Sequence, residues 1–465
     1  MEPDRTHVES PPPALLIRRG TLVTAEGLLQ ADLLIQGERI AAVGTDLSAP
    51  PGARVVDAEG HYLLPGIIDA HTHIQLDTGI YQTPDDWLIG TRAAACGGVT
   101  TVIDFATQFR GQTLRQAVEA RLAEIGRRAV VDYALHVMVT DLPPGRVEEL
   151  GDLVEMGTPS IKLYTTYRPN YYADDATLLY LLRAAAERGI LTLVHCENDA
   201  LVTAATQALV ETGRTGWAYH GRSRPALAEQ EATARVLFLA EAAGAPVYIV
   251  HNSTARTVAL VAEAREEGQI VFSETCPQYL LLDNRRYEGP EPWRYILQPP
   301  LRDPDEPERL WTMVEAGMVD VIATDHCDYT RDQKLAADNF TRTPGGLPGV
   351  ETLLPLMATY GVAEGRIGWP DLVRMLSTNP ARIYGLWPRK GALLPGSDAD
   401  VVIYDPEPET TIRAEALHYL AGYTPYEGMR VQGRVRMTVV RGQIVYEEGR
   451  FVGREGWGQF VARQL

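Results

Sequence analysis

Two histidines separated by one residue, His71 and His73, follow the apolar run 66–70 early in the chain. In a β-strand, residues i and i+2 point to the same face, so both imidazoles can be presented to one point. Neutral imidazoles at the end of a buried strand are suitable ligands for a transition metal. An isolated His-x-His is more often two unrelated polar residues where a strand meets a loop. The metal interpretation therefore depends on the positions of other ligand-type residues.

Four further ligand-type side chains lie in or just after other apolar runs of the chain. They are Lys162 within 160–164, His195 at the end of 190–195, His251 at the end of 246–251, and Asp325 directly after 319–324. One such residue alone is more often a core or rim residue. Together with His71 and His73 they make six. If all six lie at the ends of parallel strands, they meet at one mouth of a barrel, which indicates a shared site.

Lysine is rare in this chain. Of the 43 Lys and Arg residues, only Lys162, Lys334 and Lys390 are lysines, yet one of them lies inside an apolar strand. Burial lowers the pKa of an amine and leaves it neutral and nucleophilic, which a guanidinium cannot become. A neutral lysine can add carbon dioxide to form a carbamate, whose two oxygens can bridge two metal ions. The alternative is a lysine whose amine is ion-paired or reaches solvent.

These residues must be positioned by a repeating pattern of strands and helices. Short apolar runs alternate with helical segments such as 174–188, 226–243 and 254–267. This alternation predicts a parallel sheet closed into a (β/α)8 barrel. An open doubly wound sheet is the alternative, but no Gly-x-Gly-x-x-Gly follows an early strand. The eight predicted strands are 66–70, 100–105, 130–139, 160–164, 190–195, 246–251, 270–274 and 319–324.

Both flanks of the barrel region are rich in strands and poor in helices, which predicts one small β-sandwich domain built from both chain ends. The predicted parts are a flexible tail at 1–14, β-sandwich at 15–60, barrel at 61–387, β-sandwich at 388–450 and a C-terminal tail at 451–465.

Composition narrows the classes of partner. The formal net charge of −18 argues against nucleic acid, because phosphate binding requires clustered basic residues. No apolar run reaches the ~18 residues of a membrane helix, and the N-terminus has no signal-peptide pattern. The four cysteines are widely spaced and form no Cys-x-x-Cys pair, so we expect a protein of the reducing cytoplasm.

The chain resembles the amidohydrolase superfamily, and within it the hydantoinase/dihydropyrimidinase family, over nearly its whole length from about residue 15. The segments that carry this resemblance are 65–73, 90–101, 274–280, 299–302, 324–327, 349–351, 379–381, 396–400 and 424–428.

The resemblance implies a site for two divalent metal ions, usually Zn²⁺, in an enzyme that hydrolyses cyclic amides. One ion would be held by His71, His73 and Asp325, the other by His195 and His251, and carboxylated Lys162 would bridge both. A metal-bridging hydroxide would attack the ring carbonyl, with Asp325 as general base and acid. Tyr167 matches the family tyrosine that donates a hydrogen bond to the developing oxyanion. The resemblance also implies a homo-oligomer, a tetramer or a dimer.

Two substrate-binding positions depart from the family pattern. Gln298 stands where serine or threonine is common, and Gly345 where asparagine is frequent. In the family these positions bind the cyclic imide largely through backbone groups, so the departures leave the identity of the ring open. A further hypothesis is that apolar and aromatic loop residues shape the pocket for an exocyclic substituent, namely Ile74, Tyr81, Tyr171 and Tyr172.

Three alternative functions remain open. Dihydroorotases carry an arginine where this chain has Gln75, which counts against that activity. Allantoinase is harder to exclude from the sequence. Some relatives have lost metal ligands and serve as non-catalytic assembly proteins, but all six ligand positions are filled here.

Overall fold

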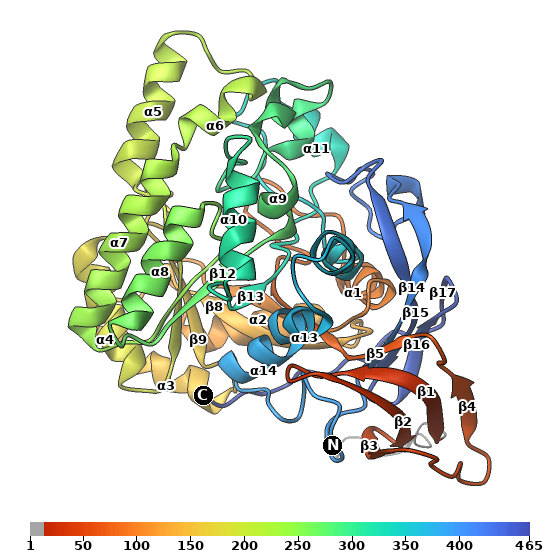
Figure 1. The fold of residues 1–465 in the computed structure, drawn as a ribbon. Helices are drawn as coiled ribbons and strands as arrows, with labels where there is room; N and C mark the ends of the chain where they lie inside the picture. The colour runs from red at the N-terminus through yellow and green to blue at the C-terminus, as the bar shows by residue number, and fades with distance from the viewer. Residues whose placement is uncertain (1–13) are drawn as a thin grey trace.

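The computed structural model describes residues 14–465, so nearly all of the predicted N-terminal tail at 1–14 lies outside the described residues. A barrel of strands and helices occupies the left of Figure 1, and a separate sheet built from both chain ends stands at the right. The predicted (β/α)8 barrel with a small β-domain from both chain ends is confirmed. The residue boundaries assigned to these parts remain a prediction.

Eight parallel strands form the barrel and pair in the order of the chain. The ring closes between β13 and β6 through a parallel bridge from Thr72 to His326, and the N–H of His73 donates to the His326 carbonyl at 2.7 Å. The closure therefore lies beside the predicted metal ligands. The strands are β6 (Ile67–Thr72), β7 (Val99–Thr107), β8 (Asp132–Met138), β9 (Ser160–Tyr164), β10 (Leu191–His195), β11 (Val247–Ile249), β12 (Val271–Thr275) and β13 (Val321–Ile322).

The longer helices surround the barrel, and several begin at a side chain that accepts hydrogen bonds from the first turn. Such caps are Asp86, Thr113, Asp174, Asn198 and Thr254. The longer helices are α1 (Trp87–Cys96), α2 (Leu114–Ile125), α3 (Glu149–Glu155), α4 (Asp175–Ala186), α5 (Asp199–Glu211), α7 (Ala226–Ala243), α8 (Ala255–Glu266) and α10 (Glu306–Glu315). The shorter ones are α6 (His220–Ser223), α9 (Pro277–Leu281), α11 (Arg331–Leu335), α12 (Leu353–Met357), α13 (Trp369–Val373) and α14 (Asn379–Ile383).

The second sheet joins the two ends of the chain where β5 pairs antiparallel with β14. Its strands share an apolar core that includes Leu33 and Ile35 from the N-terminal part and Val401 and Val439 from the C-terminal part. The strands are β1 (Leu15–Val23), β2 (Leu28–Gln36), β3 (Arg39–Gly44), β4 (Arg54–Asp57), β5 (Tyr62–Pro65), β14 (Val401–Thr411), β15 (Arg430–Val440), β16 (Gln443–Glu447) and β17 (Arg450–Phe451).

A buried ion cluster ties this sheet to the barrel. The Lys390 amine lies 2.5 Å from Asp132 on β8, 2.7 Å from Asp400 and 3.1 Å from Asp398. The Arg441 Nε lies 3.0 Å from Asp132. All of these side chains are buried, so each charge depends on its partners rather than on water.

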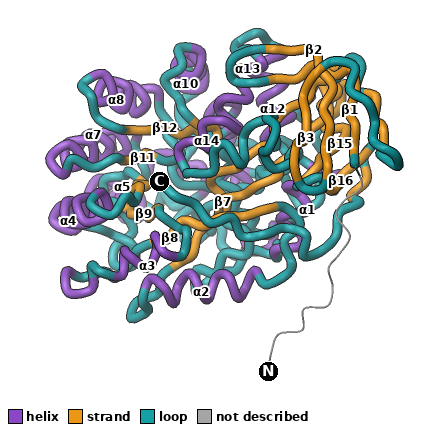
Figure 2. The backbone as a smooth tube through the Cα atoms, turned by 90° about the horizontal axis from the view of Figure 1, so that it is seen from below, coloured by secondary structure: helices purple, strands orange, loops and turns teal. Residues whose placement is uncertain are grey.

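The predicted C-terminal tail is packed beneath the barrel, where Figure 2 places the chain end under the strands. Tyr133 exchanges backbone hydrogen bonds with Gln459 and Val461, and Arg463 is buried against Ser160. The N-terminal end of the barrel is thereby covered.

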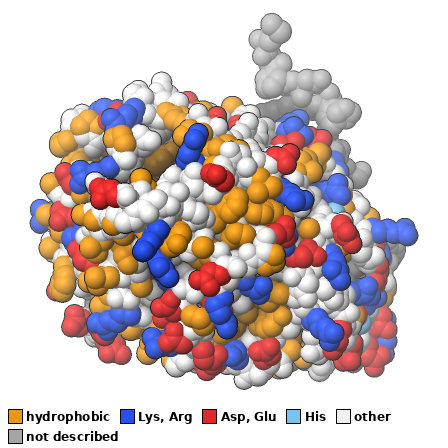
Figure 3. Space-filling model, turned by 90° about the horizontal axis from the view of Figure 1, so that it is seen from above, with side chains coloured by type: hydrophobic (Ala, Val, Ile, Leu, Met, Phe, Trp, Pro, Cys, Tyr) orange, Lys and Arg blue, Asp and Glu red, His pale blue; other side chains and the backbone are white. Residues whose placement is uncertain are grey.

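Figure 3 looks at the opposite end, where acidic and basic side chains are interspersed. Within residues 14–465, no helix has the length and apolar content to cross a bilayer.

Candidate functional site

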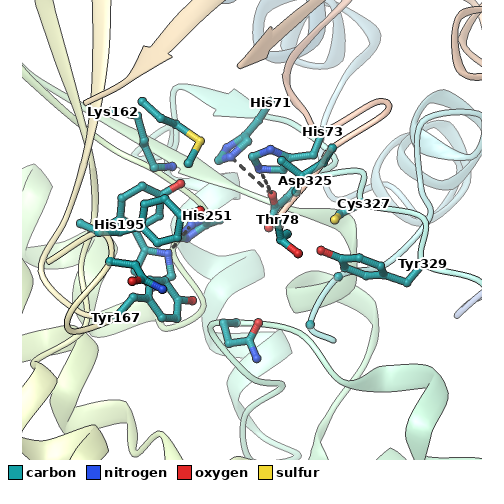
Figure 4. Close-up of a pocket in the computed structure, with 18 of the residues that line it drawn as sticks. His71, His73, Thr78, Lys162, Tyr167, His195, His251, Asp325, Cys327 and Tyr329 are labelled. Carbon is teal, nitrogen blue, oxygen red and sulfur yellow. Dashed lines mark hydrogen bonds and ion pairs between the residues drawn. The ribbon is translucent and has the colours of Figure 1, made fainter. Parts of the chain in front are cut away.

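The six predicted metal ligands line one cavity of about 400 Å³ at the C-terminal ends of the barrel strands (Figure 4). His71, Lys162 and His195 lie on β6, β9 and β10, whereas the other three directly follow strands or lie close behind them. The repeated strand-then-loop pattern thus brings side chains from five strands to one point. The ligands that follow strands are His73, His251 and Asp325.

One half of the site is formed by His71, His73 and Asp325. The Nε2 atoms of His71 and His73 lie 3.4 and 3.3 Å from the same carboxylate oxygen of Asp325. Burial lowers the pKa of His71 well below its ordinary value, so its imidazole is neutral and has a lone pair to offer. Burial alone would raise the pKa of Asp325, but the two imidazoles outweigh it and the carboxyl stays ionised.

The other half is formed by His195 and His251. The Nδ1 of His195 lies 3.0 Å from the Nε2 of His251. The Nε2 of His195 donates to Glu197 at 2.8 Å, so the lone pair of this ring is on Nδ1 and faces His251. Burial lowers the pKa of both imidazoles. Two neutral rings therefore converge here, as a metal requires.

Lys162 lies at the cavity wall between the two halves, with its side chain 1% exposed. Its amine makes no hydrogen bond or ion pair with any of residues 14–465, and its nearest ring contacts are Phe105 at 5.3 Å and Tyr164 at 5.5 Å. Burial lowers the pKa of this amine to about 8. A buried, unpaired and readily neutral amine fits the formation of a carbamate. The other two lysines, Lys334 and Lys390, are buried as well.

Three of the proposed site residues have left-handed backbone conformations. The φ angles of Tyr167, His251 and Asp325 are +72°, +39° and +52°. Residues other than glycine seldom adopt such angles, and where they do the surrounding structure must hold them there. The concentration of these angles around one cavity is typical of a functional site.

Tyr167 lies beside the His195–His251 half of the site. Its ring centroid is 5.1 Å from that of His195, and the Arg224 guanidinium stands 5.1 Å over its face. Arg224 in turn pairs with Glu197, the partner of His195. Burial raises the pKa of Tyr167, so its hydroxyl keeps its proton and remains a hydrogen-bond donor.

Sequence reasoning missed the role of Glu274, at the end of β12. One of its carboxylate oxygens lies 2.7 Å from Nδ1 of His71 and accepts the backbone N–H of His251 at 2.9 Å. The other oxygen accepts the Tyr248 hydroxyl at 2.8 Å. A carboxylate on the far nitrogen of a metal-binding imidazole fixes its tautomer and orientation. The signal available in the sequence was an acidic residue near the end of a predicted barrel strand, 270–274.

Gln298 and Gly345 both line the cavity, as does Tyr171. The hypothesis that Ile74, Tyr81 and Tyr172 also shape it is wrong. Ile74 is buried against α1, where it fills the space left by Gly90. Tyr81 lies outside the cavity wall, and Tyr172 faces a neighbouring groove beneath Arg168.

A second buried cluster, formed by Asp85, His326 and Asp328, does not have the protonation needed for a metal. The Nδ1 of His326 accepts hydrogen bonds from the backbone N–H groups of Gly349 and Val350 at 3.0 and 3.3 Å. The proton of this imidazole is therefore on Nε2, which faces Asp85 and Asp328. A protonated nitrogen cannot coordinate a cation, so these residues connect loops instead.

Comparison with known proteins decides the family. The family model described as the amidohydrolase family matches residues 62–445. This chain belongs to the amidohydrolase family. Within it, a D-phenylhydantoinase of Escherichia coli is 42% identical over 454 residues, which cover 97% of this chain and 98% of the relative.

Solved structures of amidohydrolases agree with this assignment. A D-hydantoinase superposes with a TM-score of 0.95 at 39% identity over 97% of this chain and 99% of that one. A dihydropyrimidinase from Brevibacillus agri gives 0.95 at 40% identity over 97% and 98%. The predicted membership of the hydantoinase/dihydropyrimidinase branch is confirmed, and the protein is a cyclic amidohydrolase.

Proposed function

We propose that this protein hydrolyses the ring amide bond of hydantoins and dihydropyrimidines. The observation that carries the proposal is the convergence of four histidines, Asp325 and an unpaired lysine amine on one cavity. The full-length similarity to a D-phenylhydantoinase and to a dihydropyrimidinase supports this class of ring.

The residues fit two divalent metal ions, for which we propose Zn²⁺. His71, His73 and Asp325 would hold one ion, His195 and His251 the other, and the carbamate of Lys162 would contact both. Neutral imidazoles and a carboxylate are suitable zinc ligands. When bound, the two ions would lower the pKa of a water held between them and polarise the ring carbonyl.

The chain's own residues would then move the protons. Asp325, in contact with both His71 and His73, is placed to accept the proton of the attacking water and to deliver it to the departing ring nitrogen. Tyr167 would donate a hydrogen bond to the oxygen on which negative charge develops. Arg224 and Glu197 hold Tyr167 and His195 in this arrangement.

A substrate panel tests the proposal. Protein loaded with zinc is assayed with hydantoin, 5-phenylhydantoin, dihydrouracil and allantoin, and its metal content is measured in the same preparation. We expect N-carbamoyl products from the first three rings and loss of turnover in Asp325→Asn. Turnover of allantoin alone would overturn the proposal in favour of allantoinase. Protein that binds no divalent metal would instead indicate a non-catalytic role.

We also propose a homo-oligomer in the reducing cytoplasm. Of the thirteen residues of α5, only Val202 is buried, and Leu227 and Phe238 of the neighbouring α7 are 61% and 70% exposed. A second copy of the chain would cover this apolar surface, whether in a dimer or a tetramer. The four cysteines are all free, in keeping with a reducing compartment. Light scattering measures the molar mass of the wild type and of Phe238→Glu in solution. The variant should dissociate more readily into single chains.

A further inference from the structure

The two positions at which this chain departs from its family meet in space. A Cβ atom built on Gly345 would lie 1.7 Å from Oε1, 2.3 Å from Cδ and 2.5 Å from Nε2 of Gln298. The carboxamide of Gln298 therefore occupies the space into which any side chain at position 345 would begin to extend. The two positions are 47 residues apart in the sequence, so their relationship is visible only in the fold.

The glycine at 345 is not required by its backbone. Its φ lies outside the left-handed region, and the three atoms nearest to the added Cβ all belong to the end of the flexible Gln298 side chain. Gly346 differs, because its φ is +155° and its Cβ would lie 2.8 Å from the Cys327 carbonyl oxygen. Gln298 thus excludes a side chain at 345, whereas a smaller residue at 298 would admit one.

The two loops are held in fixed register by the buried Lys334. Its amine donates to the carbonyls of Ile296 and Gly346, each at 2.7 Å, and the Gly346 N–H donates to Ile296 at 3.0 Å. Because Ile296 and Gly346 lie close to Gln298 and Gly345, these bonds hold the backbones of the two positions together at the cavity wall.

The Gln298 carboxamide is available to a ligand. It lines the cavity and is half-buried, and it makes no hydrogen bond with any of residues 14–465. The backbone N–H groups of Gln298 and Gly345 likewise make none within that range. A carboxamide offers a donor and an acceptor side by side, which complements an N–H next to a C=O on the edge of a cyclic imide.

We propose that Gln298 and Gly345 compensate for one another, and that Gln298 binds the substrate ring through its side chain. The side-chain amide that the family pattern has at position 345 stands at position 298 in this chain. This inference rests on the proposed function. It adds to that function a contact from the Gln298 side chain to the ring N–H and its neighbouring carbonyl, beside the backbone groups nearby.

A set of four variants tests the exchange, with KM and kcat measured on hydantoin and dihydrouracil. Gln298→Met keeps the volume but not the hydrogen bonds, and Gln298→Ser shortens the side chain and removes the carboxamide. We expect each to raise KM about 10-fold, the effect of about one lost hydrogen bond, with kcat within about 3-fold. Gly345→Asn should raise KM similarly, because it displaces the carboxamide. The pair Gln298→Ser with Gly345→Asn should return KM to within about 3-fold of wild type.

Two other outcomes would contradict the proposal. An unchanged KM in Gln298→Met would show that the side chain only fills space and would overturn ring binding. A KM in the double variant equal to the product of the two single effects would overturn the compensation. Failure of the proposed function is a separate result, because the wild type itself would then hydrolyse neither ring. Circular dichroism of each variant confirms that a raised KM does not reflect unfolding.

Discussion

The Nδ1 atom of His71 lies 2.7 Å from a carboxylate oxygen of Glu274, a residue 203 positions further along the chain. The same carboxylate accepts the backbone N–H of His251, whose φ of +39° needs such support. Glu274 therefore touches a ligand in each half of the site. It fixes the side chain of one histidine and the backbone of the other.

Replacing Glu274 with glutamine should weaken metal binding. The carboxylate accepts hydrogen bonds from three donors with two oxygens, whereas glutamine has a single acceptor oxygen and must turn its NH₂ group towards a donor. We expect metal affinity to fall by about 10–100-fold, as for other partners of metal-binding histidines. Metal content after dialysis against graded chelator measures it. Glu229→Gln is the matched control, because this buried glutamate pairs with Arg302 instead of a histidine. Equal metal retention in both variants would contradict the positioning role.

Tyr167→Phe should lower kcat with little change in KM. The hydroxyl is proposed to act on charge that develops only during reaction, and loss of one such donor costs about 100- to 1,000-fold in kcat. Steady-state kinetics on hydantoin measure this effect. Tyr171→Phe serves as control, because Tyr171 lines the same cavity but lies outside the proposed proton path. A similar kcat for the two variants would argue against Tyr167 as the oxyanion donor.

Lys162→Arg should abolish activity although it keeps the positive charge, because a guanidinium does not form a carbamate. We expect a loss of at least about 100-fold in kcat/KM together with lower metal content. In Lys162→Ala, acetate or propionate with added zinc should restore part of the turnover, because a small carboxylate supplies two oxygens in the space left free. Wild-type turnover in Lys162→Arg would refute the bridging role.

Lys390→Met should destabilise the fold by about 3–5 kcal/mol, because it leaves buried carboxylates without their cation. Burial by itself raises the pKa of Asp132, and Lys390 with Arg441 brings it below the ordinary value. Without Lys390 the pKa of Asp132 rises above that of the unfolded chain, and the pKa of Asp400, already raised by burial, rises further. The folded variant therefore binds more protons and gains relative stability as the pH falls.

The loss of unfolding free energy in Lys390→Met should accordingly be larger at pH 8 than at pH 5. Urea unfolding at both pH values measures it. Arg309→Met, which removes an exposed partner of Asp305, is the control and should cost less than about 1 kcal/mol at either pH. An equal loss at pH 5 and pH 8 would mean that the carboxylates remain charged in the variant.

The sequence predicts the barrel and the positions of the ligand-type residues well, because each depends on local patterns. An apolar strand that ends in a polar residue marks both the strand and the mouth it faces, as for His195 and His251. Contacts between distant segments leave no such pattern. The partnership of Glu274 with His71 depends on how β12 and β6 are placed around the closed barrel, and the contact between Gln298 and Gly345 on two loops held together by Lys334.

The error at Ile74 has a related cause. Its place one residue after His73 suggests a position in the pocket, but successive residues at a strand end alternate in direction. Ile74 consequently turns away from the cavity and packs on α1 at Gly90. The direction of a loop side chain depends on the helix beneath it, which the local sequence does not specify.

Burial of every lysine has a practical consequence for handling the protein. Lys162, Lys334 and Lys390 are each no more than 1% exposed, so their amines are shielded from reagents in solution. Aldehyde-activated resins and succinimidyl ester dyes, which couple through lysine amines, would find no target among these side chains. The 61 aspartate and glutamate residues offer carbodiimide coupling as the better route to immobilisation, provided that Asp325 is protected by an occupied cavity.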